Sequence, residues 1–178
     1  WLIEAVALFW IGRTKGQQLL NIMSYPILIL SFICLVIDWN GSYMGTELKF
    51  SPFVNTHFLQ SLIFLGTLIF IYLNTEKVKP ETLEKESLVI KHFARNIVYV
   101  LILAVIFFSV QLEITHYWNM EYMQSLEFAR SSDHFTGRGN PNIWAFAMVT
   151  KILYSLVFLS VFAFIYRKRQ RTEEFNIL

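Results

Sequence analysis

Polar and ionisable side chains inside long apolar stretches are the residues of this sequence that could do chemistry. A charge near the middle of a bilayer costs about 2.5 to 3.5 kcal/mol on insertion scales, so such residues usually face a bundle interior, a partner or water. Lys151 and Glu113 are the clearest cases, and Glu4 lies in the apolar run that opens the chain. The candidate binding set, which we expect to line one polar cavity, comprises Asp38, Asn55, His57, Gln60, Glu113, His116 and Lys151.

Glu113 and Lys151 are expected to reach similar depths on consecutive helices. Counted along each helix at about 1.5 Å per residue, Lys151 lies roughly 24 Å from Arg167 and Glu113 roughly 27 Å from Arg95. An ion pair between them is geometrically reasonable, with His116 one turn further out as a third member. The alternative is that both side chains extend to the lipid headgroups, and the sequence favours neither arrangement.

No motif for a reaction accompanies these residues. A metal site is not expected, because there is no tight ligand pair such as His-x3-His. A covalent nucleophile has no support, since Ser31, Ser61 and Ser109 lie in apolar runs without an evident base. Cys34 is the single cysteine, which excludes an internal disulfide and a cysteine metal site. We therefore predict no catalytic residue, metal or cofactor.

The composition indicates a membrane protein. Of the 178 residues, 55% are apolar and only 16% are charged, and the mean hydropathy is +0.47, which is too apolar for an ordinary soluble domain of this size. The net charge of +2 is small, and the basic residues fall in clusters near the ends of apolar segments. Nucleic-acid binding is therefore not expected, and the predicted partner is a lipid bilayer.

Apolar segments predict an all-α bundle of about five transmembrane helices. The pattern centres on Asn96 to Leu112, seventeen uncharged residues followed by the polar sequence up to Trp118, long enough to cross most of a hydrocarbon core about 30 Å thick. A polar turn is expected over Asn40–Pro52 and a loop over Asn119–Pro141. The expected spans are residues 1–12, which form only the end of a helix, and residues 19–38, 53–73, 96–118 and 142–166.

The charged connector between the third and fourth spans, residues 74–95, is expected to form a surface helix that begins near Pro80 and Glu81. A solvated connector lying on the headgroups is favoured over a partner-binding site. The chain opens on Trp1 inside a hydrophobic run and stops at Leu178 as another apolar segment begins. We expect it to be an internal piece of a longer protein, whose other helices would be further partners.

The basic residues predict the orientation of the helices. Eleven lysines and arginines fall in connections on one side and three on the other, and positively charged connections stay in the cytoplasm. The first helix is thus expected to run from outside to inside, with the candidate polar cavity facing outward and the C-terminal end in the cytoplasm. The eleven are Arg13, Lys15, Lys77, Lys79, Lys85, Lys91, Arg95, Arg167, Lys168, Arg169 and Arg171, and the three are Lys49, Arg130 and Arg138.

Several short motifs resemble a large bacterial family of predicted multi-pass membrane proteins built as arrays of paired helices. In that family a Leu-Glu-Ala helix that ends in Gly-Arg recurs, and the likeness covers nearly the whole chain, as in a late part of an array from a Bacteroidetes-like member. The resemblance implies a many-helix inner-membrane protein and carries over no catalytic residue. The motifs are Trp1-Leu2-Ile3-Glu4-Ala5 with Leu8, Trp10, Gly12 and Arg13, then Phe53-Val54-Asn55, Gln111-Leu112-Glu113 with His116-Tyr117, and Asn142-Ile143-Trp144 with Tyr154-Ser155-Leu156.

Two functions of different classes fit these observations. The first is transport of a solute or lipid in the cell envelope, with the polar cavity as the binding site and Glu113 with Lys151 as a gate or proton-sensitive pair. The second is a structural or scaffolding membrane array without turnover. An intramembrane enzyme ranks third, because no catalytic motif supports it.

Overall fold

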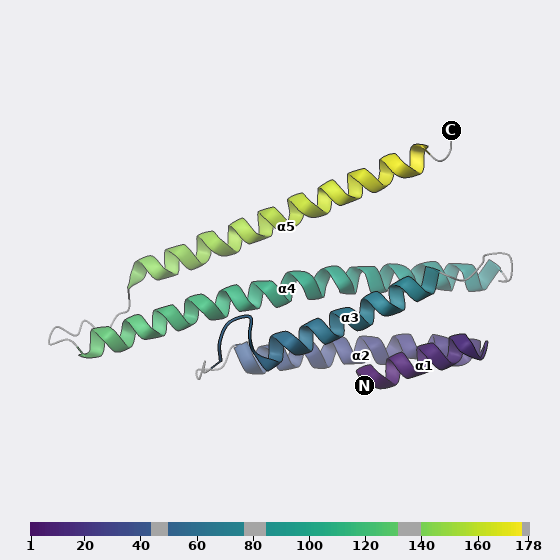
Figure 1. The fold of residues 1–178 in the computed structure, drawn as a ribbon, viewed down its shortest axis with the longest axis horizontal. Helices are drawn as coiled ribbons and strands as arrows, with labels where there is room; N and C mark the ends of the chain where they lie inside the picture. Colours follow the sequence, from purple (N-terminus) through teal and green to yellow (C-terminus); the bar gives the residue numbers. More distant parts are fainter. Residues whose placement is uncertain (44–49, 77–84, 132–139, 176–178) are drawn as a thin grey trace. The chain divides into compact units, whose positions relative to one another are not determined.

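The computed structural model describes residues 1–43, 50–76, 85–131 and 140–175, and over these ranges it contains helices and no strand. The all-α prediction is therefore confirmed. Four of the helices are long and apolar enough to cross a membrane, over Gln18–Tyr43, Thr56–Thr75, Phe93–Phe128 and Pro141–Lys168. The elements shown in Figure 1 are α1 (Leu2–Thr14), α2 (Gln18–Tyr43), α3 (Thr56–Glu76), α4 (Lys85–Ser131) and α5 (Pro141–Phe175).

The chain divides into two compact units, which are described separately. The N-terminal unit, Trp1–Ser109, holds α1, α2, α3 and the first half of α4. The C-terminal unit, Val110–Leu178, holds the second half of α4 and α5.

The N-terminal unit packs through stripes in which hydroxyl residues are interspersed with large apolar side chains. On α3 the buried side chains recur every three or four residues, which keeps them on one helix face. Hydroxyls within the stripes bond to their own helix, as when Ser31 Oγ donates to the Ile27 carbonyl at 2.8 Å and Thr75 Oγ1 donates to the Ile71 carbonyl at 2.8 Å. Such residues let membrane helices approach closely without leaving a polar group unpaired. The buried stripes are Ser24, Leu28, Ser31, Leu35 and Trp39 on α2, and Ser61, Phe64, Leu68, Ile71 and Thr75 on α3.

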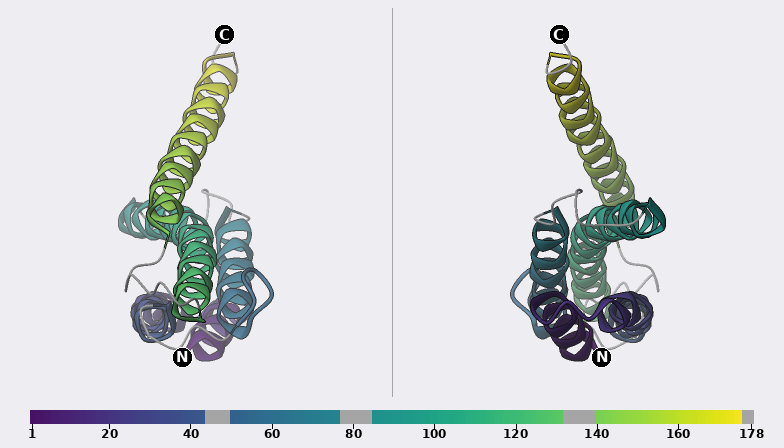
Figure 2. Two further views of the ribbon diagram at one scale, coloured as in Figure 1. Left: turned by 90° about the vertical axis from the view of Figure 1, so that its left-hand side faces the viewer. Right: turned by 90° about the vertical axis from the view of Figure 1, so that its right-hand side faces the viewer.

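A tight turn joins α1 to α2, and the two helices lie side by side in Figure 2. Gly16 has φ +65°, a conformation that residues with a side chain rarely adopt. A Cβ atom added to Gly12 would lie only 2.5 Å from the backbone nitrogen of Asn21. This close approach requires glycine, and it sets how near the end of α1 lies to the start of α2.

Helices extend further than the sequence predicted. The expected turn over Asn40–Pro52 is wrong in its first residues, because α2 continues to Tyr43. The expected loop over Asn119–Pro141 is wrong up to Ser131, where α4 ends. Residues 119–131 contain no proline or glycine and are rich in helix formers such as Met, Glu, Leu and Ala, so helix propensity carries α4 on beyond the apolar segment.

The other boundaries differ by a few residues. Helix α3 begins at Thr56 instead of Phe53, and α5 continues past Tyr166 to Phe175. The expected surface helix is continuous with α4 from Lys85, whereas its predicted start at Pro80 and Glu81 lies outside the described residues.

The C-terminal unit is held by fewer contacts. The rings of Trp118 on α4 and Phe146 on α5 stack with centroids 6.2 Å apart and planes inclined by 14°. The Asn140 N–H donates to Ser125 Oγ at 3.2 Å, and Asn140 Oδ1 accepts from the Asn142 N–H at 3.0 Å, capping α5. Most apolar side chains of α5 are exposed. In a bilayer this helix therefore presents its surface to lipid or to other protein.

Candidate functional site

The ends of α2 and α3 bring together two of the predicted site residues. His57 Nδ1, in the first turn of α3, lies 3.1 Å from Asp38 Oδ2 near the end of α2. The same nitrogen lies 3.1 Å from Ser42 Oγ, one helical turn beyond Asp38. Nδ1 is thus within hydrogen-bond distance of both oxygens, and an ionised Asp38 carboxylate would accept from it when Nδ1 carries the ring proton.

This geometry argues against Ser42 as a nucleophile. In a serine–histidine–carboxylate triad the hydroxyl and the carboxylate bond to opposite nitrogens of the ring, so that the histidine can take the hydroxyl proton. Here both partners lie on Nδ1. The cluster therefore holds a histidine in one orientation and does not activate a hydroxyl.

Water reaches the Asp38–His57 pair only partly. The His57 side chain is 26% exposed and that of Asp38 is 34% exposed. Two aromatic rings pack against the imidazole, Tyr43 with centroids 6.1 Å apart and Phe50 with centroids 5.3 Å apart. The pair is therefore partly covered by aromatic side chains.

A buried hydrogen bond lies beneath the pair. Trp39 Nε1–H donates to Ser61 Oγ at 2.9 Å, and Ser61 in turn donates to the His57 carbonyl at 2.9 Å. The Trp39 ring also lies 6.5 Å from that of Phe108 on the first half of α4. The end of α2 is thereby joined to α3 by one partly exposed and one buried polar contact.

Asn55 and Gln60 have other positions. Asn55 Oδ1 accepts from the Phe58 N–H at 2.7 Å, which makes Asn55 the N-cap of α3. Gln60 is exposed and lines a groove beside α2. Neither side chain makes a hydrogen bond to Asp38 or His57 among the described residues.

Glu113 and His116 lie on one face of α4 in the C-terminal unit, three residues apart. Both side chains are fully buried, at 0% exposure. An ionisable group buried in a membrane-spanning helix is costly unless it is paired or hydrogen-bonded, so such residues are functional candidates by default. A role for either residue in a binding site stays a prediction.

Lys151 lies on α5 and is partly exposed. Within the described part of the chain its ammonium makes no ion pair. The pairing of Glu113 with Lys151 stays a prediction. The single cavity expected to hold all seven residues draws on both units, and it too stays a prediction.

Ser42, Tyr43 and the Trp39–Ser61 hydrogen bond were not expected from the sequence. Ser42 and Tyr43 lie on α2 because that helix continues past Asn40, where a turn was expected. A signal was present, because Asp38 and Ser42 are four residues apart and share a face if the helix continues.

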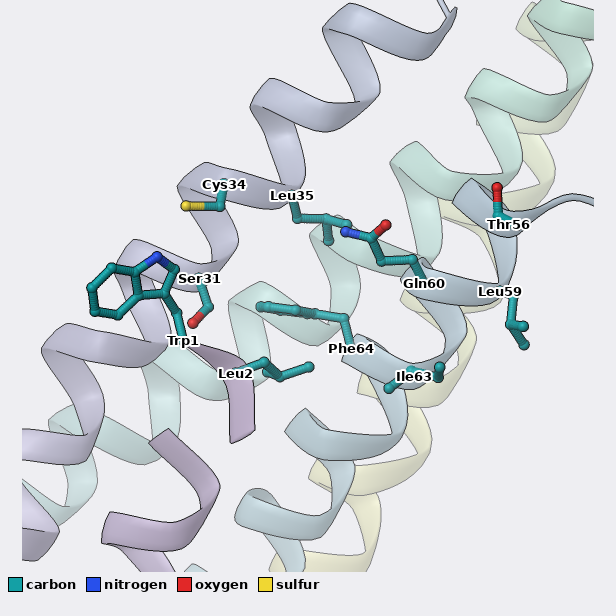
Figure 3. A pocket seen from close by; sticks show the side chains of 10 residues that line it. All are labelled: Trp1, Leu2, Ser31, Cys34, Leu35, Thr56, Leu59, Gln60, Ile63 and Phe64. Carbon is teal, nitrogen blue, oxygen red and sulfur yellow. The ribbon is translucent and has the colours of Figure 1, made fainter. Parts of the chain in front are cut away.

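A second feature of the N-terminal unit is a groove of about 350 Å³ between α1, α2 and α3, called here the α1–α3 groove. Figure 3 shows Gln60 and Phe64 of α3 pointing toward α2 across it. Its lining is mainly apolar, without a charged side chain. The lining residues are Trp1, Leu2, Ser31, Cys34, Leu35, Thr56, Leu59, Gln60, Ile63 and Phe64.

Among the described residues, four helices are long and apolar enough to cross a membrane, which indicates an α-helical membrane protein. No protein-family model matches the chain, and comparison with curated proteins and with solved structures finds no match. The site therefore has to be interpreted from its own geometry.

Proposed function

We propose that the chain belongs to a transporter of a bacterial inner membrane that moves a solute or lipid of the cell envelope and responds to protonation at the Asp38–His57 pair. The observation that carries the proposal is a partly water-accessible carboxylate–imidazole contact of 3.1 Å between the ends of two membrane-spanning helices. Ionisable residues at such places usually mark ion or substrate pathways.

Protonation would change how α2 and α3 are held together. Histidine is the side chain that ordinarily changes charge between pH 5 and 8. A positive charge on the imidazole would strengthen its attraction to Asp38, whereas loss of the carboxylate charge would weaken it. Because the Trp39–Ser61 hydrogen bond is buried, we expect α2 and α3 to separate first at the partly exposed Asp38–His57 contact. Glu113 and Lys151 form a second proposed proton-sensitive pair.

The proposed orientation places the α2–α3 end outside the cell and the end of α5 in the cytoplasm. It rests on the eleven-to-three distribution of basic residues. In a cysteine-free background, single cysteines at Ser42 and Ser131 should react with an impermeant thiol reagent added to intact cells, and one at Thr82 should not. Labelling at Thr82 without permeabilisation would reverse the orientation.

A non-catalytic membrane scaffold is the second candidate. The buried stripes of the N-terminal unit favour it, because hydroxyls bonded to their own helix among large apolar side chains serve static packing. In a scaffold the Asp38–His57 pair would only stabilise the contact between the end of α2 and the start of α3.

Reconstitution separates the two functions. The purified protein is placed in phosphatidylethanolamine–phosphatidylglycerol vesicles, and flipping of a fluorescent phospholipid and proton flux into the lumen are both recorded. Transport predicts activity above protein-free vesicles that falls in Asp38→Asn and His57→Gln. Asn40→Ala is the matched control, because Asn40 is exposed on the same helix end and bonds only to its own helix at the Val36 carbonyl. Absence of both fluxes would leave the scaffold as the better function.

A further inference from the structure

Two oxygens on α2 lie against one nitrogen of the His57 ring. Nδ1 is 3.1 Å from Asp38 Oδ2 and 3.1 Å from Ser42 Oγ. This nitrogen carries at most one hydrogen, which it donates to one oxygen or shares between the two. We propose that Ser42 becomes the main partner of His57 when Asp38 loses its charge, so that the contact between α2 and α3 is exchanged and not broken. This inference concerns the regulation of the Asp38–His57 site, and it rests on the proposed function only where it bears on transport.

The two oxygens differ in how their hydrogen bonds depend on charge. A hydrogen bond from Nδ1 to an ionised Asp38 is charge-assisted and roughly twice as strong as one between neutral groups. Protonation of the carboxylate removes this advantage. The Ser42 hydroxyl is both a donor and an acceptor, so it can accept from a protonated Nδ1 and donate to a bare one. Ser42 is therefore a partner for His57 in every protonation state of the ring and of the carboxylate.

The placement of the two oxygens makes the exchange possible without a large movement. Asp38 and Ser42 are four residues apart on α2, which continues to Tyr43, so both project from the same helix face. Because both oxygens already lie at the same distance from Nδ1, the hydrogen can pass from one to the other while the ring stays between them. The end of α2 thus keeps a polar contact with the start of α3.

Few titratable groups surround the ring in the described part of the chain. Asp38 and Tyr43 face it from α2, and Phe50 packs against it from the segment before α3. The first turn of α3 carries no acidic residue. A tyrosine phenol ordinarily stays protonated over the range in which carboxylates and histidines change charge. The exchange should therefore follow the charges of Asp38 and His57.

A double-mutant cycle tests whether Asp38 and Ser42 can replace each other. Asp38→Ala and Ser42→Ala each leave one oxygen for Nδ1, whereas the double variant leaves neither. We expect the double variant to lose more stability than the two single losses combined, by roughly two- to tenfold in the unfolding equilibrium constant. Unfolding of the purified full-length protein by sodium dodecyl sulfate in mixed micelles measures it. Asn40→Ala combined with Asp38→Ala is the control and should be additive, because Asn40 bonds only to the Val36 carbonyl of its own helix.

The pH dependence separates an exchange of partners from ordinary packing. A carboxylate is ordinarily ionised at about pH 8 and largely protonated at about pH 3.5. The loss caused by Ser42→Ala should therefore be small at the higher pH and grow as the pH falls. Ser42→Thr keeps the hydroxyl and should retain most of the stability at both values.

Three results would overturn the proposal. The first is an additive cycle, and the second is a loss in Ser42→Ala that does not change with pH. The third is failure of Ser42→Ala to fold at neutral pH, because Asp38 should then suffice. These measurements need no transport. A cycle with the expected excess loss but no flux in vesicles removes transport and leaves the exchange, whereas flux with an additive cycle removes the exchange and leaves transport.

Discussion

The two units of this chain are similarly apolar and yet pack differently. The most apolar 18-residue stretches of α2 and α5 have mean hydropathies of 2.3 and 2.1, but 22% of the residues in the α2 stretch are buried and none in the α5 stretch. In α1, α2 and α3, Gly12 and four hydroxyl residues are buried together with large apolar side chains, whereas most large apolar side chains of α5 are exposed. Apolarity suits a helix to a bilayer, but it does not by itself determine whether that helix packs against a neighbour.

The largest loss of stability is expected from a change at the α1–α2 contact. Gly12→Ala should destabilise the N-terminal unit by about 1 to 3 kcal/mol, because the new Cβ overlaps the Asn21 backbone. Gly66→Ala is the matched control, since its Cβ would meet nothing within 4 Å, and it should be neutral or slightly stabilising. Thermal unfolding in detergent measures both. Equal stability of the two variants would mean that close packing does not hold this hairpin.

Breaking the buried hydrogen bond between α2 and α3 should lower the free energy of unfolding by a smaller amount. Trp39→Phe removes the donor to Ser61 Oγ and should cost about 1 kcal/mol, the usual net value of one hydrogen bond. Trp144→Phe on α5 is the control from the other unit, because Trp144 is 64% exposed. The same unfolding measurement applies. A larger loss in the Trp144 variant would show that the C-terminal unit has packing that its exposure does not reveal.

The coupling energy between Glu113 and Lys151 should be the smallest of the three changes in stability. Such a pair would add a contact to the C-terminal unit, in which most apolar side chains of α5 are exposed. If the charges pair, Glu113→Gln and Lys151→Met should each destabilise the protein, and the double variant should recover part of the loss. Couplings between polar groups in membranes average about 0.6 kcal/mol. A double-mutant cycle in bilayers measures the recovery. Simply additive losses would exclude the pair and make the scaffold the better function.

Much of the fold was predictable because the bilayer limits the possibilities. A run such as Asn96 to Leu112 has to form a helix in lipid, where every backbone group needs an internal partner. Helix ends in water are not constrained in this way. Local helix propensity therefore determines where these helices end, and α2 continues to Tyr43 and α4 to Ser131, past the ends of their apolar runs.

The sequence by itself determined the all-α class, the positions of the apolar helices and the polar residues worth testing, because all of these follow from residue type and spacing. The tertiary structure decided which of those residues meet. Asp38 contacts His57, Asn55 caps α3, and Gln60 lines a groove beside α2. It also showed that Gly12 is required by a close backbone approach. Such pairings depend on how helices rotate and cross, which small contacts set and apolarity alone does not encode.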